Sequence, residues 1–159
     1  VWFGKATQRF SMPVFARYVR ILPQKWNGHI AMRSGMLVCQ ECDSGTVLLN
    51  PGECQRRYSS VFNGSRPGLQ HSHSMLGSKQ AWSPAKFKDE YMQVDLGRVH
   101  LVSGIVTQGH QSQNHWVTKY AVRCSEDGKS WNEVGPVFVG NLDADSPVTN
   151  TLPYAVMAR

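Results

Sequence analysis

Residues Tyr91-Met92-Gln93-Val94-Asp95-Leu96 alternate between apolar and polar side chains. In a β-strand, successive side chains point to opposite faces, so Met92, Val94 and Leu96 would share one face and the polar residues between them the other. Such alternation is typical of a strand with one face against a core and one face toward water. The stretch therefore predicts a half-buried β-strand.

The same strand pattern continues on both sides of this stretch, as short apolar runs separated by turn signals. Asp127-Gly128 lies between two such runs and is the kind of dipeptide that closes a tight hairpin, so we expect a turn within Ser125–Trp131. No long window keeps the period of an amphipathic helix. The pattern predicts an all-β fold, either a sandwich or a jelly roll. The expected strands are Tyr18–Leu22, Met92–Leu96, Val102–Val106, Tyr120–Cys124 and Val137–Val139.

The composition fits one folded domain. The chain has 159 residues, of which 41% are hydrophobic, enough to bury a sizeable core. No stretch approaches the roughly 18 apolar residues that a membrane span needs. The N-terminus lacks the layout of a secretion signal. We therefore expect a single domain that does not cross a membrane, and nothing in the sequence calls for a cofactor.

The net charge of +6 favours acidic partners such as sulfated or sialylated glycans, anionic lipid or nucleic acid. The simpler interpretation is a surface that happens to be basic, because the Lys and Arg residues are dispersed. No block reaches the five or more consecutive basic residues of a nucleic-acid arm. We therefore expect no nucleic-acid partner.

The four cysteines, Cys39, Cys42, Cys54 and Cys124, are an even set that allows two disulfides in three connectivities. Asn63-Gly64-Ser65 is an N-glycosylation sequon, and both features favour an extracellular, secreted or cell-surface location. The alternative for Cys39-x-x-Cys42 is half a zinc site or a redox pair. Zinc needs two further ligands, and no second C-x-x-C or H-x3-5-H follows, so we expect no metal.

Signals for catalysis are missing from the sequence. It has 11 acidic residues, mostly in turns, and neither a G-x-S-x-G nor a Walker motif. Neither a Ser-His-Asp set nor a pair of carboxylates stands out. We predict that the chain is not an enzyme.

The two ends of the chain resemble each other. Val137-Phe138-Val139-Gly140 leading to Pro153–Arg159 is echoed by Val1-Trp2-Phe3-Gly4 leading to Pro13–Arg17. Only the N-terminal copy, which ends at Arg17, continues into a strand, Tyr18–Ile21. Two segments would then compete for one strand position, which favours a tandem-repeat or domain-swapped assembly.

From Tyr58 onward the chain resembles the discoidin family, also called the coagulation factor V/VIII C-type domain. The family's closing motif is an Ala-Arg-Tyr-Val-Arg-Ile strand followed by a Trp, an Ile and a Cys. Here it lies at the start of the chain, as Ala16–Ile21, Trp26, Ile30 and Cys39. The stretches that match in family order are Tyr58–Ser60, Ala81–Pro84, Tyr91–Gly97, Val102–Gly109, Trp116–Tyr120, Ser125–Trp131 and Phe138–Asp143.

The resemblance implies an eight-stranded antiparallel jelly-roll β-sandwich of the galactose-binding-like type, in circularly permuted strand order. Residues 1–159 would form one domain, in which 1–39 correspond to the family's C-terminal strands, 40–57 to the joined old termini and 58–159 to the N-terminal part. A sequence that begins inside one tandem repeat and ends inside the next would show the same strand order, and this alternative to circular permutation remains open. The same mapping implies the disulfides Cys39–Cys42 and Cys54–Cys124.

Several residues in and between the matching motifs have structural interpretations. Trp82, Trp116 and Trp131 lie beside turns, where core packing is a simpler role than ligand stacking. Asp95 lies inside an apolar strand and needs a partner such as Arg17 or Arg20 if it is buried. For His71 and His73, a solvated loop is a simpler interpretation than a metal site, because no carboxylate or cysteine pattern accompanies them.

In this family, ligands are held by loops at one end of the sandwich. By position these loops are Val61–His73, Gly77–Lys79, His110–His115 and Gln24–His29. Family members that dock on phosphatidylserine membranes carry exposed apolar pairs at the loop tips, and His110–His115 has none.

The loops are instead rich in amides, imidazoles and an Arg, which make directional hydrogen bonds to sugar hydroxyls, and Trp26 or Phe62 could stack on a sugar ring. We predict a lectin-like adhesion module for cell-surface or matrix glycans. The rivals are anionic phospholipid, a protein ligand such as collagen or a receptor, and a spacer repeat without a ligand. The predicted ligand-binding residues are Trp26, Asn27, His29, Phe62, Asn63, Arg66, His71, His73, Lys79, His110, Gln113, Asn114 and His115.

Overall fold

The computed structural model describes residues 6–40, 45–144 and 148–149, and almost all of its regular structure is β-strand. Its three helices are single 3-10 turns, so within the described residues no helix could cross a membrane. The all-β prediction is confirmed. The strands are β1 (Ala6–Asn27), β2 (Arg33–Cys39), β3 (Thr46–Leu49), β4 (Arg56–Tyr58), β5 (Met92–Gln108), β6 (Trp116–Ser125), β7 (Asn132–Glu133), β8 (Phe138–Val139) and β9 (Val148–Thr149), and the helices are η1 (Glu53–Gln55), η2 (Phe62–Gly64) and η3 (Gln70–Ser72).

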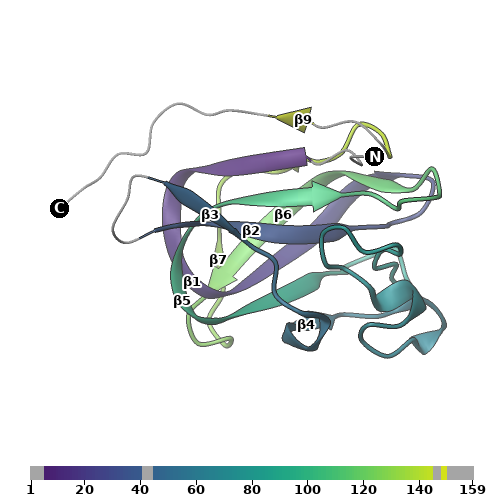
Figure 1. Cartoon of the computed structure of the whole chain (residues 1–159), viewed down its shortest axis with the longest axis horizontal. Helices are drawn as coiled ribbons and strands as arrows, with labels where there is room; N and C mark the ends of the chain where they lie inside the picture. Colours follow the sequence, from purple (N-terminus) through teal and green to yellow (C-terminus); the bar gives the residue numbers. More distant parts are fainter. Residues whose placement is uncertain (1–5, 41–44, 145–147, 150–159) are drawn as a thin grey trace.

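Two long strands, β1 and β5, pair with each other along most of their length and bend together. The β1 register shifts between Ala16 and Tyr18, and the facing part of β5 contains Gly97 in the left-handed region at φ 82°. Glycine adopts this conformation without a side-chain clash, so the chain turns the corner while the strand continues. The shared bend lies at the left of Figure 1 and folds the sheet into two layers.

The strand order is β3-β2-β5-β1-β6-β7, with β4 added to β5 and β8 to β6. The pairings are antiparallel except that the short β9 runs parallel to β1. Because β2 pairs with the second half of β5 and β4 with the first half, the two layers are the halves of a jelly-roll sandwich. The predicted strands Met92–Leu96 and Val102–Val106 are thus two parts of one bent strand, and β1 begins at Ala6, well before Tyr18.

The core between the layers follows the alternation in the sequence. Met92, Val94 and Leu96 are buried, whereas the polar residues between them are half-buried. Trp82 is fully buried, and its Nε1 donates a hydrogen bond of 2.9 Å to the Ser60 carbonyl oxygen. The core role predicted for Trp82 is therefore confirmed.

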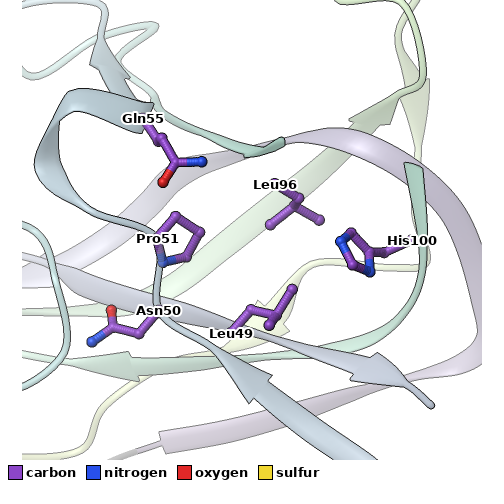
Figure 2. A pocket seen from close by; sticks show the side chains of 6 residues that line it. All are labelled: Leu49, Asn50, Pro51, Gln55, Leu96 and His100. Atoms are coloured by element: carbon purple, nitrogen blue, oxygen red, sulfur yellow. The ribbon is translucent and has the colours of Figure 1, made fainter. Parts of the chain in front are cut away.

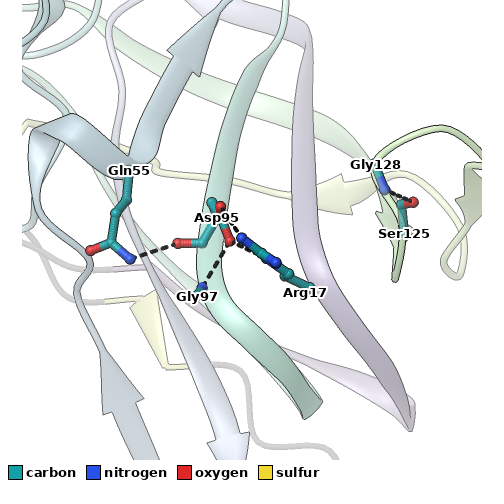
Figure 3. Close-up of polar contacts among 6 residues, drawn as sticks. All are labelled: Arg17, Gln55, Asp95, Gly97, Ser125 and Gly128. Carbon is teal, nitrogen blue, oxygen red and sulfur yellow. Dashed lines mark hydrogen bonds and ion pairs between the residues drawn. The ribbon is translucent and has the colours of Figure 1, made fainter.

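Asp95 has the structural partner that its position requires (Figure 3). Arg17 Nε donates to Asp95 Oδ1 at 2.9 Å and Nη2 to Oδ2 at 3.1 Å, while the Gly97 amide donates to Oδ1 at 2.8 Å. The Arg17 guanidinium, opposed by partial desolvation, holds the pKa of Asp95 below its ordinary value. Of the two candidate partners, Arg20 instead lies over the rings of Tyr91, at 4.4 Å, and Trp131, at 3.9 Å.

The predicted hairpin turn forms after β6. Gly128 has φ 75°, and its amide donates to Ser125 Oγ at 2.8 Å (Figure 3). The Asp127 carboxylate accepts the amides of Lys129 and Ser130, both at 2.8 Å. These backbone hydrogen bonds lower the pKa of Asp127 to about 2, so its charge fixes the turn at neutral pH.

The predicted Cys54–Cys124 disulfide is wrong. Both thiols are free, with Cys54 exposed in η1 and Cys124 buried on β6, where burial raises its pKa to about 12. Strands β5 and β1 separate β4, which follows η1, from β6. Three strand spacings amount to about 14 Å, whereas a disulfide needs Cα atoms within about 7 Å. Cys42 lies outside the described residues, so the Cys39–Cys42 pairing stays a prediction.

Candidate ligand-binding site

The predicted ligand loops gather at one end of the sandwich. Strand β1 ends there at Asn27, β2 begins there at Arg33, β5 ends at Gln108 and β6 begins at Trp116. The register places Arg33 opposite Gln108 and Asn27 opposite Trp116, so the loops between these strands are neighbours. Much of the long segment between β4 and β5 also lies at this end, at the right of Figure 1. The bend shared by β1 and β5, in the middle of each strand, lies at the other end of the sandwich.

Six ring-bearing side chains, one from the end of β1 and five from three connections between strands, form what we call the aromatic-imidazole cluster. Trp26 stacks on Phe87 with ring centroids 5.9 Å apart, and Phe87 also contacts His29 at 4.9 Å. Phe62 lies 6.1 Å from the His29 ring. The cluster is exposed or half-buried throughout, so it forms a ring-lined surface at the loop end. Its members are Trp26, His29, Phe62, His71, Phe87 and His115.

A side-chain hydrogen bond and a close approach at Gly28 hold the end of β1 against the 110–115 loop. Asn27 Nδ2 donates to the Asn114 carbonyl oxygen at 2.9 Å. Gly28 has φ 65°, and a Cβ at this position would collide with the His115 ring and lie 2.9 Å from the Asn114 carbonyl oxygen. Glycine is therefore required here both for its conformation and for the close approach. The Asn114 side chain remains exposed beside the cluster.

His110 is buried, with 3% of its surface exposed, and it stabilises the loop instead of lining its outer surface. The Ser112 amide donates to Nδ1 at 3.2 Å, and Nε2 lies 3.1 Å from Gln80 Oε1. Burial, and then the positive charges of Arg33, His115 and His71, lower the pKa of His110. Burial and the charge of His29 lower the pKa of His115 in the same direction. Both imidazoles are therefore neutral at pH 7.

Other predicted residues lie in the predicted loops without joining the cluster. Across the described residues, no side-chain hydrogen bond or ring contact connects them to it, and no group of three His, Cys, Asp or Glu is placed to hold a metal. Asn63 is exposed at φ 57°, so its sequon is accessible. These residues are Asn63, Arg66, His73, Lys79 and Gln113.

Phe87 belongs to the cluster, and the sequence prediction missed it. Its side chain is 54% exposed, and it lies between the exposed Lys86 and Lys88. One signal was available, because a large apolar residue between two charges in a polar loop is unusual. What makes it part of the site is its stacking on Trp26, more than fifty residues away, and no local pattern shows that contact.

Two hollows on the surface of the described residues share no lining residue with the cluster. One of about 290 Å³ is found beside β3 and the bend of β5 (Figure 2). A second, of about 460 Å³, lies between the start of β1 and the segment that carries β7 and β8. Neither is lined by a predicted ligand-binding residue. The residues around the first hollow are Leu49, Asn50, Pro51, Gln55, Leu96 and His100.

The fold and the loop-end site are those of a β-sandwich family, and sequence comparison identifies it. The profile of the F5/8 type C domain matches residues 58–159, which is more than half of the chain. The chain therefore belongs to the F5/8 type C domain family, and the discoidin resemblance is confirmed.

Relatives match over most of the chain. Neuropilin-1 from Homo sapiens is 27% identical over 161 residues, covering 91% of this chain and 17% of that protein. Coagulation factor VIII is 29% identical in Sus scrofa and 30% in Canis lupus familiaris, each over 94% of this chain and 8% and 7% of those proteins. The chain thus spans less than a fifth of the length of these relatives. No solved structure matches it.

Proposed function

We propose that the chain is an extracellular, non-catalytic adhesion module that binds carbohydrate through the aromatic-imidazole cluster. The observation that carries this proposal is the stacked pair of Trp26 and Phe87 at the exposed loop end. Aromatic faces pack against the apolar C–H face of a sugar, which a polar solvated loop does not offer. The accessible sequon at Asn63 supports the extracellular location.

Polar groups beside the rings supply the hydrogen bonds that a sugar needs. The Asn114 amide is exposed, and the Asn27 side chain keeps its oxygen as an acceptor while its nitrogen donates to the Asn114 carbonyl. A neutral His115 carries one ring donor and one ring acceptor. Sugar hydroxyls both donate and accept, so amides and neutral imidazoles match them better than fixed charges do.

A glycan-array screen of the purified chain at physiological salt tests this proposal. Binding to a few related glycans should be lost in Trp26→Ala and Asn114→Ala. Trp131→Ala and Asn132→Ala are matched controls, because Trp131 contacts Arg20 and Asn132 lies on β7, away from the loop end. A blank array, or equal losses in the controls, would contradict the proposal and direct attention to protein ligands such as collagen or a receptor.

Anionic phospholipid is a second candidate, and one observation favours it. Phe87 is exposed and lies between two lysines in the sequence, and Phe62 and Leu69 are also exposed, at 42% and 57%. Exposed apolar tips with basic neighbours suit insertion into a charged membrane surface. In liposome co-sedimentation, this function predicts pelleting that depends on phosphatidylserine, weakens with salt and is lost in Phe87→Ser.

We also infer that the segments 1–39 and 58–159 form one domain around the joining segment 40–57. In support, β1 lies between β5 and β6, so strands from both segments build one sheet. A sequence alignment pairs residues in the same order along both proteins. The alignment with human neuropilin-1 covers 91% of this chain. That relative therefore has its matching segments in the same order as this chain, which favours a frame across tandem repeats over a circular permutation.

Light scattering would test strand exchange between copies of the chain. Strand exchange predicts a dimer, and a strictly monomeric chain would exclude it.

A further inference from the structure

Like charges face each other twice between strands β1 and β6. The register places Arg20 opposite Arg123 and Lys25 opposite Lys119. Side chains directly opposite each other in an antiparallel pair have Cβ atoms about 4.5–5.5 Å apart, so two positive charges at such positions repel each other and destabilise the sheet. Two repelling pairs between the same two strands therefore need an explanation.

Both pairs lie on the outer face of their sheet layer. In β6, the even-numbered residues of Tyr120–Cys124 are buried, so the odd-numbered Lys119 and Arg123 point away from the core. Paired residues on neighbouring strands point to the same side, which places Arg20 and Lys25 on the outer face as well. Lys25 and Lys119 are exposed, and Arg20 and Arg123 are half-buried. The four cations therefore face solvent together.

A third arginine extends this row of charge across the layer. Arg57 on β4 is exposed and pairs with Gln93 on β5, and Gln93 in turn pairs with Arg20. Arg57, Arg20 and Arg123 thus lie in one line across β4, β5, β1 and β6, a width of about 14 Å at the usual strand spacing. Lys25 lies about 16 Å beyond Arg20 along β1. We call this surface the basic face, and its members are Arg20, Lys25, Arg57, Lys119 and Arg123.

Most of the charge on the basic face is not neutralised by acidic side chains. The ion pairs within the described residues are Arg17–Asp95 and Arg123–Glu133, so Arg123 alone among the five cations has an acidic partner there. The side chains of Arg123 and Glu133 are 44% and 73% exposed, so water and salt weaken their attraction. The basic face therefore keeps most of its positive charge and attracts anions.

Arg20 is held in position by uncharged neighbours. Its Nε donates to Gln93 Oε1 at 3.0 Å. Its guanidinium carbon lies 3.9 Å from the centroid of the Trp131 ring and 4.4 Å from that of Tyr91. These contacts order the guanidinium but leave its charge in place. They also occupy a face of each ring, which is then not free to stack on the bases of a nucleic acid.

We propose that the basic face binds a linear sulfated polysaccharide, at a surface separate from the aromatic-imidazole cluster. Sulfate groups repeat along such a chain and accept charge-assisted hydrogen bonds from several cations at once, which offsets the repulsion within the two like-charge pairs. Trp26 of the cluster packs against the core, so it points away from the side on which the neighbouring Lys25 lies. The inference rests on the proposed extracellular location, where sulfated polysaccharides occur, and is independent of the loop-end sugar site.

Calorimetry with a heparin octasaccharide tests this surface. Lys25→Gln combined with Lys119→Gln should weaken binding about tenfold, as expected for the loss of two exposed ionic contacts, and should make the affinity less dependent on salt. Arg9→Gln combined with Arg98→Gln is the matched control, because it removes the same charge from the other layer and from the bend of β5. The control should bind as tightly as the wild type. Equal losses in the two double variants would indicate attraction by net charge alone and would overturn the proposal.

A single substitution separates loss of binding from loss of folding. Lys119→Glu replaces the repulsion with Lys25 by attraction, so this variant should unfold at no lower denaturant concentration than the wild type while losing affinity for heparin. Unchanged heparin affinity in Lys119→Glu would overturn the proposal. Asn114→Ala should keep heparin binding, so failure of the loop-end site and failure of the basic face are distinguishable. Tighter binding of single-stranded DNA of similar charge would overturn the assignment to a sulfated polysaccharide.

Discussion

Removing the hydroxyl from two tyrosines in the core should change stability in opposite directions. Tyr120 is fully buried, and its hydroxyl has no partner within the described residues. The Tyr58 hydroxyl contacts Ser74 Oγ at 2.7 Å, Glu53 Oε2 at 3.0 Å and the Ser72 carbonyl oxygen at 3.1 Å. Burial is the first cause that raises the pKa of each phenol, so both hydroxyls are protonated at neutral pH.

The magnitudes follow from what each hydroxyl gains in the folded state. Burying a hydroxyl without a partner costs about 1–3 kcal/mol, so Tyr120→Phe should raise the free energy of unfolding by about 1 kcal/mol. Tyr58→Phe removes a hydroxyl whose contacts include the half-buried Glu53 carboxylate, and hydrogen bonds to charged groups are worth more than neutral ones. This substitution should lower the free energy of unfolding by about 2 kcal/mol.

Unfolding in guanidinium chloride at pH 7 measures both changes, provided that the slope of the free energy of unfolding against denaturant concentration is the same in all three proteins. The wild type is the reference, and each variant serves as the control for the other because the deleted atom is the same. A loss of more than about 1 kcal/mol in Tyr120→Phe would refute the reasoning, because it would mean that the hydroxyl has a stabilising partner.

Three further changes test other parts of the structure. The pKa of His110 is lowered in the folded state, so its contribution to stability is complete above the unfolded pKa of about 6.5. That contribution is lost as the pH falls below this value, because the unfolded state then binds more protons. Urea unfolding between pH 5 and 8 should show this decline in stability, and the decline should be smaller in His110→Gln. Trp82→Ala should lower the free energy of unfolding, measured by calorimetry, by about 3–5 kcal/mol, because it empties a fully buried site and leaves the Ser60 carbonyl without its donor. Gly28→Ala should weaken glycan binding by displacing His115, whereas Gly64→Ala, which shares a positive φ but faces open space, should leave binding intact.

Local patterns predicted the parts of the fold that local physics determines. The alternation in Met92–Leu96 gave the buried face, and Asp127-Gly128 gave the turn, because side-chain period and turn conformation depend on neighbouring residues. The bend of β5 at Gly97 was not predicted, since a glycine can end a strand or bend it. Only the pairing with β1 distinguishes these outcomes.

Contacts between distant segments account for what the sequence did not give. The resemblance brought the loops to one end, but Phe87 was missed because its contact with Trp26 depends on how separate loops pack. The Cys54–Cys124 pairing came from the mapping of the remaining cysteines, and the strand order separates them. Asp95 shows the intermediate case, in which a half-buried carboxylate called for an arginine partner and the structure pairs it with Arg17.

Chemical-shift mapping with a glycan selected on the array would locate the ligand on the structure. Titrated into the isotope-labelled chain, the glycan should shift the Trp26 indole signal and the signals of Asn114 and His115, at the loop end. Signals at the opposite end, around Leu96 and His100 beside the hollow of Figure 2, should not move. Shifts confined to that hollow, with the Trp26 indole unchanged, would contradict a carbohydrate site at the aromatic-imidazole cluster.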